Sequence, residues 1–330
     1  MSDKGVPVPS QQLRGPAELV LATLVARRYY IDGRTKIEIG DEFRLSRFKV
    51  ARLLDSARNQ GLVRIEISYP GAVDVELSAQ LRETFALEHA IVVNTHDEEE
   101  EALRKQLGLA TAELLSEVLT GEDVLGLAWA RTVRAMVTEL RSLPAVPVVQ
   151  LTGALSRSTE TSSSVEGDNS IDVVREAARI AGGPAYLFFA PLLVPDGSTA
   201  QALHRQPDVA RALIMMGSVS RAVMGVGRWA PAQSTLYDAA TEPERRALAQ
   251  QGVCAEIGGV FLGADGEPLH TSLNERMVAM TADQMRAIPD VIAIPYGVSK
   301  RPAVHAALRS GLVNSLVTHS SLATALIGEP

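Results

Sequence analysis

The chain has 330 residues, of which 46% are hydrophobic and 22% are charged, values typical of a soluble globular protein with sizeable cores. No apolar run reaches the ~18 residues that cross a membrane, and the N-terminal residues lack the apolar segment of a signal peptide. Cys254 is the only cysteine, which excludes a disulfide framework and a cysteine-based zinc site. We therefore expect a cytoplasmic protein without membrane contact, metal or cofactor.

Charge is distributed unevenly along the chain. Residues 1–64 contain 12 Lys and Arg against 7 Asp and Glu, a net charge of +5, whereas residues 65–330 contain 20 against 32, a net charge of −12. A basic N-terminal part on an acidic body is typical of a polyanion-binding protein, although chance clustering of surface charge gives the same asymmetry. The N-terminal part is therefore the first place to look for a nucleic-acid site.

The N-terminal part predicts three helices. Apolar positions at helical spacing predict the first helix over residues 18–30. Thr35 and Glu38 are spaced as a capping box, which predicts the start of a second helix. Ser46 is expected to cap a third helix, which ends near Gly61 because glycine favours helix C-termini.

The second and third of these helices, joined by a break at Arg44-Leu45, have the pattern of a helix-turn-helix. Arg44 stands where a turn glycine is common, so we expect a slightly altered turn. The first turn of the third helix would enter the major groove, where Arg47 can pair with guanine in bidentate fashion. The candidate DNA-binding residues are Thr35, Ser46, Arg47, Lys49, Val50 and Arg52, although Val50 also belongs to the apolar face. The alternative is an ordinary helical hairpin with a solvated basic face.

From residue 90 onward, short apolar runs alternate with amphipathic helical stretches. This alternation predicts an α/β fold with an open, mostly parallel sheet and helices on both faces. The runs expected as strands are residues 91–93, 124–128, 146–151, 185–190, 222–226, 291–294 and 316–318. The chain is expected to contain a flexible leader (1–14), a helix-turn-helix domain (15–68), a linker (69–89) and an effector-binding domain (90–330). A wing is expected over 62–67, and a short helix over 78–85.

Several motifs, in the same order along the chain, resemble the SorC/DeoR-type sugar-binding transcriptional regulators. They are Tyr29-Tyr30, Thr35-Lys-Ile-Glu-Ile, Leu45-Ser-Arg-Phe-Lys-Val-Ala-Arg-Leu-Leu, Gly121-Glu-Asp-Val-Leu-Gly-Leu-Ala-Trp-Ala-Arg-Thr, Val149-Gln-Leu-Thr-Gly, Met224-Gly-Val-Gly, Gly252-Val-Cys-Ala-Glu-Ile, Gly297-Val-Ser-Lys and Leu316-Val-Thr-His. The resemblance covers roughly residues 18–327. It implies a Rossmann-type C-terminal domain related to NagB/RpiA sugar-phosphate isomerases and deaminases, which acts as a sensor. It also implies a homodimer or homotetramer that binds double-stranded operator DNA.

Open α/β sheets bind ligands at the carboxyl ends of their strands, and several segments of this chain supply such ends. The candidate effector-binding residues are Trp129, Ala130, Arg131, Thr132, Thr152, Gly153, Ala154, Gly225, Gly227, Glu256, Gly297 and Lys300. Arg131, at a helix start, suits an anion, and Thr132 can also cap that helix. Glu256 could accept hydrogen bonds from sugar hydroxyls, and Lys300 could contact a phosphate or a hydroxyl. A packing role for Trp129, and structural ion pairs for the three charged residues, are the alternatives.

The chain departs from the pattern that it resembles at four positions. Ala128 and Ala130 replace the usual serine and glycine, while Glu256 and His319 stand where aspartate is usual. These changes predict a pocket with altered ligand preference. The sequence therefore leaves both a sugar phosphate and a sugar or polyol without phosphate as candidate ligands. Gly225-Val-Gly227 begins like a dinucleotide fingerprint but lacks the third glycine, and the histidines lack metal-ligand spacing.

These observations predict a DNA-binding regulator of carbohydrate catabolism or uptake that is not an enzyme and responds to a sugar, polyol or sugar phosphate. The main alternative is a sugar-phosphate isomerase-like enzyme with an added N-terminal domain, for which Glu256 is a candidate acid or base without a clear partner. A C-terminal domain that only oligomerises is another alternative. A covalent Schiff base through Lys300 or Lys105 is a variant of the sensor hypothesis.

Overall fold

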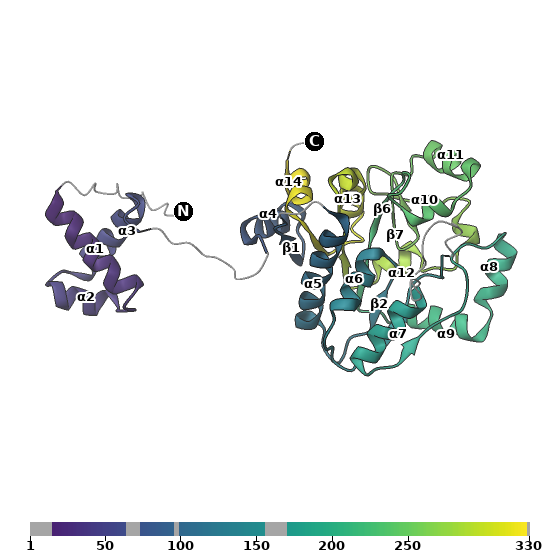
Figure 1. The fold of residues 1–330 in the computed structure, drawn as a ribbon, viewed down its shortest axis with the longest axis horizontal. Helices are drawn as coiled ribbons and strands as arrows, with labels where there is room; N and C mark the ends of the chain where they lie inside the picture. The colour runs from purple at the N-terminus through teal and green to yellow at the C-terminus, as the bar shows by residue number, and fades with distance from the viewer. Residues whose placement is uncertain (1–14, 64–72, 96–98, 156–169, 329–330) are drawn as a thin grey trace, which may run out of the picture. The chain divides into compact units, whose positions relative to one another are not determined.

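The computed structural model describes residues 15–63, 73–95, 99–155 and 170–328 (Figure 1). The chain forms two compact units, residues 1–68 and residues 69–330. The predicted leader over 1–14 and most of the predicted wing over 62–67 lie outside the described residues. Among the residues described, no helix is both long and apolar enough to span a bilayer.

The first unit packs helices α1 (Pro16–Tyr30), α2 (Lys36–Phe43) and α3 (Arg47–Asn59) around one small core. The core side chains are Ala22, Val25, Ala26, Ile39, Val50, Leu53, Leu54 and Ala57, all almost inaccessible to water. They recur at helical spacing along α1 and α3, which places them on one face of each helix. Hydrophobic burial between these faces is what holds the three short helices together, because helices of this length are marginal alone.

Local hydrogen bonds define the turn between α2 and α3, as predicted. Thr35 and Glu38 form a complete capping box at the start of α2, and the Ser46 hydroxyl accepts a hydrogen bond from the Lys49 amide at the start of α3. Arg44 nevertheless adopts the left-handed conformation that glycine favours, with φ of 54°, so the expected alteration of the turn is not seen. The Leu45 amide donates to the Gly40 carbonyl and closes the turn.

The second unit is built on a seven-stranded sheet whose neighbouring strands all run parallel. Its order is β1-β11-β10-β5-β2-β3-β4. The strands are β1 (His89–Val93), β2 (Leu125–Leu127), β3 (Val148–Gln150), β4 (Ala185–Tyr186), β5 (Arg221–Met224), β10 (Asp290–Ala293) and β11 (Ser315–His319). Every predicted run overlaps one of these strands, so the predicted parallel sheet is confirmed.

Helices cover both faces of this sheet. One face packs against α5 (Glu100–Val118), α6 (Arg131–Glu139) and α7 (Ser170–Ala181). The other packs mainly against α4 (Val75–Phe85), α9 (Pro207–Met216), α12 (Ala282–Arg286), α13 (Arg301–Arg309) and α14 (Ser320–Ile327). Successive strand residues alternate between the two cores: Val291 and Ala293 join one, and Ile292 joins the other. Burial on both faces explains why the strands read as continuous apolar runs.

A second, antiparallel sheet lies beside the first and was not predicted. It has the order β6-β7-β8-β9, with β6 (Val226–Arg228), β7 (Ala255–Ile257), β8 (Val260–Leu262) and β9 (Pro268–Leu269). Together with α10 (Thr235–Ala239) and α11 (Glu242–Gln250) it encloses a third core around Trp229 and Phe261. The predicted strand 222–226 is divided between the two sheets, because the chain leaves the parallel sheet at Gly225.

The expectation of a linker over 69–89 needs correction for residues 73–89, the part of that range that the structure describes. Helix α4 occupies Val75–Phe85, and strand β1 begins at His89. Leu81 and Leu87 are buried in the core of the second unit, and the Asp74 amide donates to the Val92 carbonyl. A segment that contributes side chains to a core in this way is part of the domain. Helix α8 (Gly197–His204) carries its own Asp196 cap, and two short 3-10 helices span Asn274–Arg276 and Val298–Lys300.

Candidate functional site

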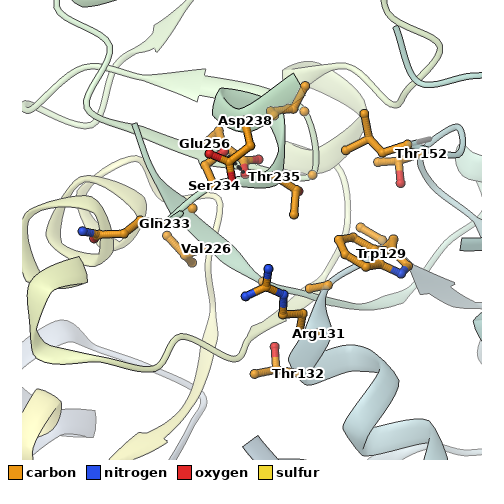
Figure 2. Close-up of a pocket in the computed structure, with 18 of the residues that line it drawn as sticks. Trp129, Arg131, Thr132, Thr152, Val226, Gln233, Ser234, Thr235, Asp238 and Glu256 are labelled. Carbon is orange, nitrogen blue, oxygen red and sulfur yellow. Dashed lines mark hydrogen bonds between the residues drawn. The ribbon is translucent and has the colours of Figure 1, made fainter. Parts of the chain in front are cut away.

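A cavity opens at the carboxyl ends of the central strands of the parallel sheet (Figure 2). From β2 the chain proceeds outward to β3 and β4, whereas from β5 it proceeds in the other direction to β10 and β11. The cavity therefore lies at the point where the strand order reverses, the usual ligand-binding position of an open α/β sheet. The antiparallel sheet and the start of α10 form its opposite wall.

The structure brings most of the predicted effector residues together around this cavity. Those that line it are Trp129, Ala130, Arg131, Thr132, Thr152, Gly153, Gly225, Gly227, Glu256 and Lys300. Gly225 is required where the segments that follow β2 and β5 approach each other, because a Cβ there would lie 2.7 Å from the Cβ of Ala130. Gly153 is required for a similar reason, since its Cβ would lie 2.7 Å from the backbone of Pro191.

Two predicted residues lie outside the cavity lining. Ala154 forms a bridge with Pro191, and its amide and carbonyl are used in backbone hydrogen bonds to Ala190 and Leu192. Gly297 has φ of 86°, a conformation that favours glycine, and its amide donates to Nε2 of His319 over 3.0 Å. Both residues shape the loops beside the cavity, and their assignment to direct ligand contact stays a prediction.

Arg131 provides positive charge on one side of the cavity. It begins α6, and its side chain extends toward the space between the walls in Figure 2. Within the described ranges the guanidinium has no ion-pair or hydrogen-bond partner. The predicted capping role of Thr132 was wrong: the residue lies inside the helix, and its hydroxyl donates to the Ile294 carbonyl over 3.1 Å. The N-terminus of α6 consequently has no side-chain cap, and its amides and Arg131 together favour an anion.

Glu256 lies on the opposite wall, in strand β7, directly across from Gly227 in β6. A side chain at position 227 would collide with the Glu256 carboxylate and with Ser234, so the glycine makes room for both. The Ser234 hydroxyl donates to Oε1 of Glu256 over 3.0 Å. Burial raises the pKa of the Glu256 carboxyl, while the Ser234 hydrogen bond and the Lys300 charge act in the opposite direction.

Lys300 is held at the edge of the same cavity. Its Nζ donates to the Val226 carbonyl over 2.9 Å and lies 4.9 Å from the centre of the Tyr296 ring. Burial lowers the pKa of the Lys300 ammonium, whereas Tyr296 and Glu256 favour its charged form. Lys300 and Glu256 act on each other through space without a direct ion pair. The alternative of a structural ion pair between them is therefore not what the structure has.

Trp129 both packs in the core and lines the cavity, the two positions that the sequence analysis considered for it. Its ring packs against the core beneath α5, α6 and α7, and it also lines the cavity. Its indole Nε1 is buried and has no hydrogen-bond partner in the part of the chain that the structure describes. Buried indole N–H groups ordinarily have a partner, so this atom is a candidate donor to a bound ligand.

Sequence reasoning missed one wall of the cavity, formed by the residues that enter α10. They include Gln233, Ser234, Thr235 and Asp238, with Tyr296 from the loop after β10. Ser234 is the N-cap of α10 and accepts a hydrogen bond from the Tyr237 amide. A polar Gln-Ser-Thr run after Pro231 is the signal that could have indicated this helix start.

The predicted DNA-binding residues differ in how far their side chains are exposed to solvent. Thr35, Ser46, Arg47 and Arg52 are exposed, and Lys49 is half-buried with its Nζ 3.8 Å from the Glu18 carboxylate. Val50 is completely buried in the core of the first unit. Its inclusion among the DNA contacts was wrong, because the same helical face cannot pack inward and meet a base. Elsewhere in the described ranges, no cluster of His, Cys, Asp and Glu has the composition of a metal site.

Comparisons with known proteins agree with this architecture. Residues 70–328 match the family described as "Putative sugar-binding domain". The chain is 28% identical over 339 residues to the transcriptional regulator LsrR of Enterobacter sp. (strain 638), covering 99% of each. It is 27% identical over 325 residues to LsrR of Klebsiella pneumoniae, covering 94% of each. The full-length sorbitol operon regulator SorC of Klebsiella pneumoniae has a similar fold, with a TM-score of 0.72 and 23% identity over 94% of this chain and 100% of that one.

Proposed function

Because the chain belongs to the sugar-binding domain family of SorC/DeoR-type regulators, we propose that it is a transcription regulator whose DNA affinity is set by a carbohydrate effector. The first unit binds double-stranded operator DNA, and the cavity of the second unit binds a sugar, polyol or sugar phosphate. The protein acts in the cytoplasm as a homodimer or homotetramer. The genes that it controls serve carbohydrate uptake or breakdown.

The cavity is the observation that carries the sensor part of this proposal. One side offers Arg131 and the uncapped N-terminus of α6, which suit an anionic or strongly polar group. The other side offers Glu256 and Ser234, which suit hydroxyl groups. A carbohydrate presents many hydroxyls and, when phosphorylated, one anionic end, so both walls have a partner. The NagB/RpiA-like ancestry that the sequence implies is consistent with this chemistry.

The first unit supports the DNA-binding part. Helices α2 and α3 are joined by a closed turn at Arg44 and Leu45, and α3 turns its apolar face into the core. Ser46, Arg47 and Arg52 are thereby left on the surface of α3. This arrangement is that of a helix-turn-helix whose second helix enters the major groove, with the arginines contacting base edges and phosphates.

The test is a gel-shift titration of the full chain on the DNA upstream of its own gene. Each candidate sugar, polyol and sugar phosphate is added at fixed protein concentration. We expect one specific complex and a change in its apparent affinity with at least one carbohydrate. Absence of a specific complex on that DNA and on neighbouring promoters would contradict the proposal.

An enzyme is the second candidate, and one observation favours it. Burial raises the pKa of Glu256 and lowers the pKa of Lys300 within one cavity, and each shift is toward the neutral range in which acid–base catalysts work. Turnover of a sugar phosphate by the pure protein, abolished by Glu256→Gln, would establish catalysis. Binding of carbohydrates without turnover, seen as a rise in melting temperature, supports the sensor instead.

A further inference from the structure

Phe48 has no role in the fold of the first unit. It is the second residue of α3, and 78% of its surface is exposed, the largest value among the large apolar side chains that the structure describes. Its chain neighbours are Arg47 and Lys49. An exposed phenyl group gains nothing from hydrophobic burial in the free protein, so a residue of this kind at a binding surface suggests a partner.

The position of Phe48 on the helix points it away from the core. Val50 marks the buried face, and each residue advances about 100° around an α-helix. Phe48, two residues earlier, and Arg52, two residues later, are therefore both about 200° from Val50 and lie one turn apart on the opposite face. Arg47 is displaced from Val50 by only about 60° and lies on the flank. The first two turns of the outward face thus present one phenyl and one guanidinium group, and Asp55 and Asn59 continue this face further along the helix.

We propose that Phe48 is a specificity-determining residue that packs against the C5 methyl of thymine, while Arg52 contacts a neighbouring base or phosphate. This inference rests on the proposed function, in which α3 lies in the major groove. A phenyl ring cannot hydrogen-bond to base edges, and the apolar group that the major groove presents is the thymine methyl. The flanking Arg47 and Lys49 match the negative charge of the phosphates on either side of the groove.

The base-reading centre of α3 therefore differs from the sequence-based choice of Arg47. Arg47 remains exposed near the start of the helix, where it can reach a base at the edge of the site or a phosphate. Phe48 and Arg52 face the groove floor directly. The selected DNA site should consequently contain at least one thymine whose methyl group matters for affinity.

The experiment begins with selection of duplexes from a random pool by the full chain. In the selected duplex each thymine is then replaced singly by deoxyuridine, which removes only the methyl group. We expect one or two replacements per half-site to weaken binding about fourfold each, the effect of one buried methylene-sized group. Phe48→Ala should bind the unmodified duplex about fourfold more weakly than wild type. Its affinity should not change further when those thymines are replaced by deoxyuridine. Phe48→Leu should keep the sensitivity in part.

Val20→Ala is the matched control, because it also truncates an exposed apolar residue, here on α1. It should change neither the affinity for the unmodified duplex nor the effect of the deoxyuridine replacements. Equal sensitivity to deoxyuridine in wild type and Phe48→Ala would overturn the inference. So would a wild type that prefers a sequence but ignores every replacement, or a Phe48→Ala loss that is the same on all duplexes, as expected if Phe48 contacts a second protein copy. Failure to select any sequence would instead contradict the proposed function itself.

Discussion

The two candidate binding surfaces carry charge in opposite ways. On α3, Arg47 and Arg52 are exposed to solvent. In the cavity, Glu256 is shielded and accepts a hydrogen bond from Ser234, and Lys300 is shielded and donates one to the Val226 carbonyl. Dissolved salt screens the electrostatic interactions of exposed cations. The interactions of shielded groups are screened little by salt and depend mainly on whether each group is protonated. DNA affinity should therefore fall steeply with salt, and effector affinity should depend mainly on pH.

Gly227→Val should produce the largest effect, confined to the cavity. The added side chain would occupy the space of the Glu256 carboxylate and of Ser234, so carbohydrate binding should be lost. DNA binding without effector should persist, because the first unit has its own core. Calorimetric titration with the effector and a gel shift measure the two quantities.

Gly121→Val is the control for that substitution, since a Cβ at Gly121 meets no atom within 4 Å. It should bind effector like wild type. Normal effector binding by Gly227→Val would mean that the ligand lies elsewhere.

Lys300→Met tests the cationic group at the cavity edge. Losing a charged hydrogen-bond donor should weaken effector binding by about 1.5–3 kcal/mol. Methionine keeps most of the volume of the side chain beside Tyr296, so the melting temperature of the unliganded protein should change little. An unaltered effector titration would assign Lys300 a structural role through its bond to the Val226 carbonyl.

Arg47→Ala should weaken binding to the selected duplex by about 1–3 kcal/mol if it reads a base. If it contacts a phosphate instead, the loss should be similar on all duplexes and the slope of log affinity against log salt should decrease by about 1. Binding measured at several salt concentrations separates the two. No change in affinity or slope would remove Arg47 from the interface.

Glu256→Gln should alter the pH dependence of stability. Burial raises the folded-state pKa of Glu256, so its favourable contribution is complete below the unfolded pKa and is lost as the pH rises through the folded pKa. The glutamine variant should therefore gain stability relative to wild type as the pH rises across that window. Denaturant unfolding at several pH values measures the difference, and a constant difference would contradict the raised pKa.

Arg44→Gly should give the smallest effect, a stabilisation of the first unit by about 1 kcal/mol. Arginine at φ of 54° is strained, and glycine is not. Thermal unfolding of the full chain, followed for the transition of the first unit, measures it. Destabilisation would mean that the Arg44 side chain contributes contacts that outweigh the strain.

Sequence alone predicted the elements whose signals are local. The Thr35 and Ser46 caps, the buried face of α3 and the seven parallel strands all follow from spacing within short windows. The cavity was predicted from strand ends and family resemblance, and Arg131 and Glu256 are among the residues that line it.

The missed features depend on contacts between distant segments. The antiparallel sheet depends on pairing between β6 and β7, which are separated by 26 residues in the chain, and this pairing also brings the α10 wall to the cavity. Thr132 bonds to a carbonyl 162 residues away, which no local capping rule anticipates. The linker error has the same origin, since α4 and β1 join the core through residues near the C-terminus.

The coupling between the two units is tested most directly by the affinity of the full chain for its selected duplex, measured with and without saturating effector in wild type and in Gly227→Val. We predict a change of at least about fivefold in wild type, the lower end of ordinary allosteric coupling, and none in the variant. An identical response in both proteins, or no response to any carbohydrate that binds wild type, would contradict the account.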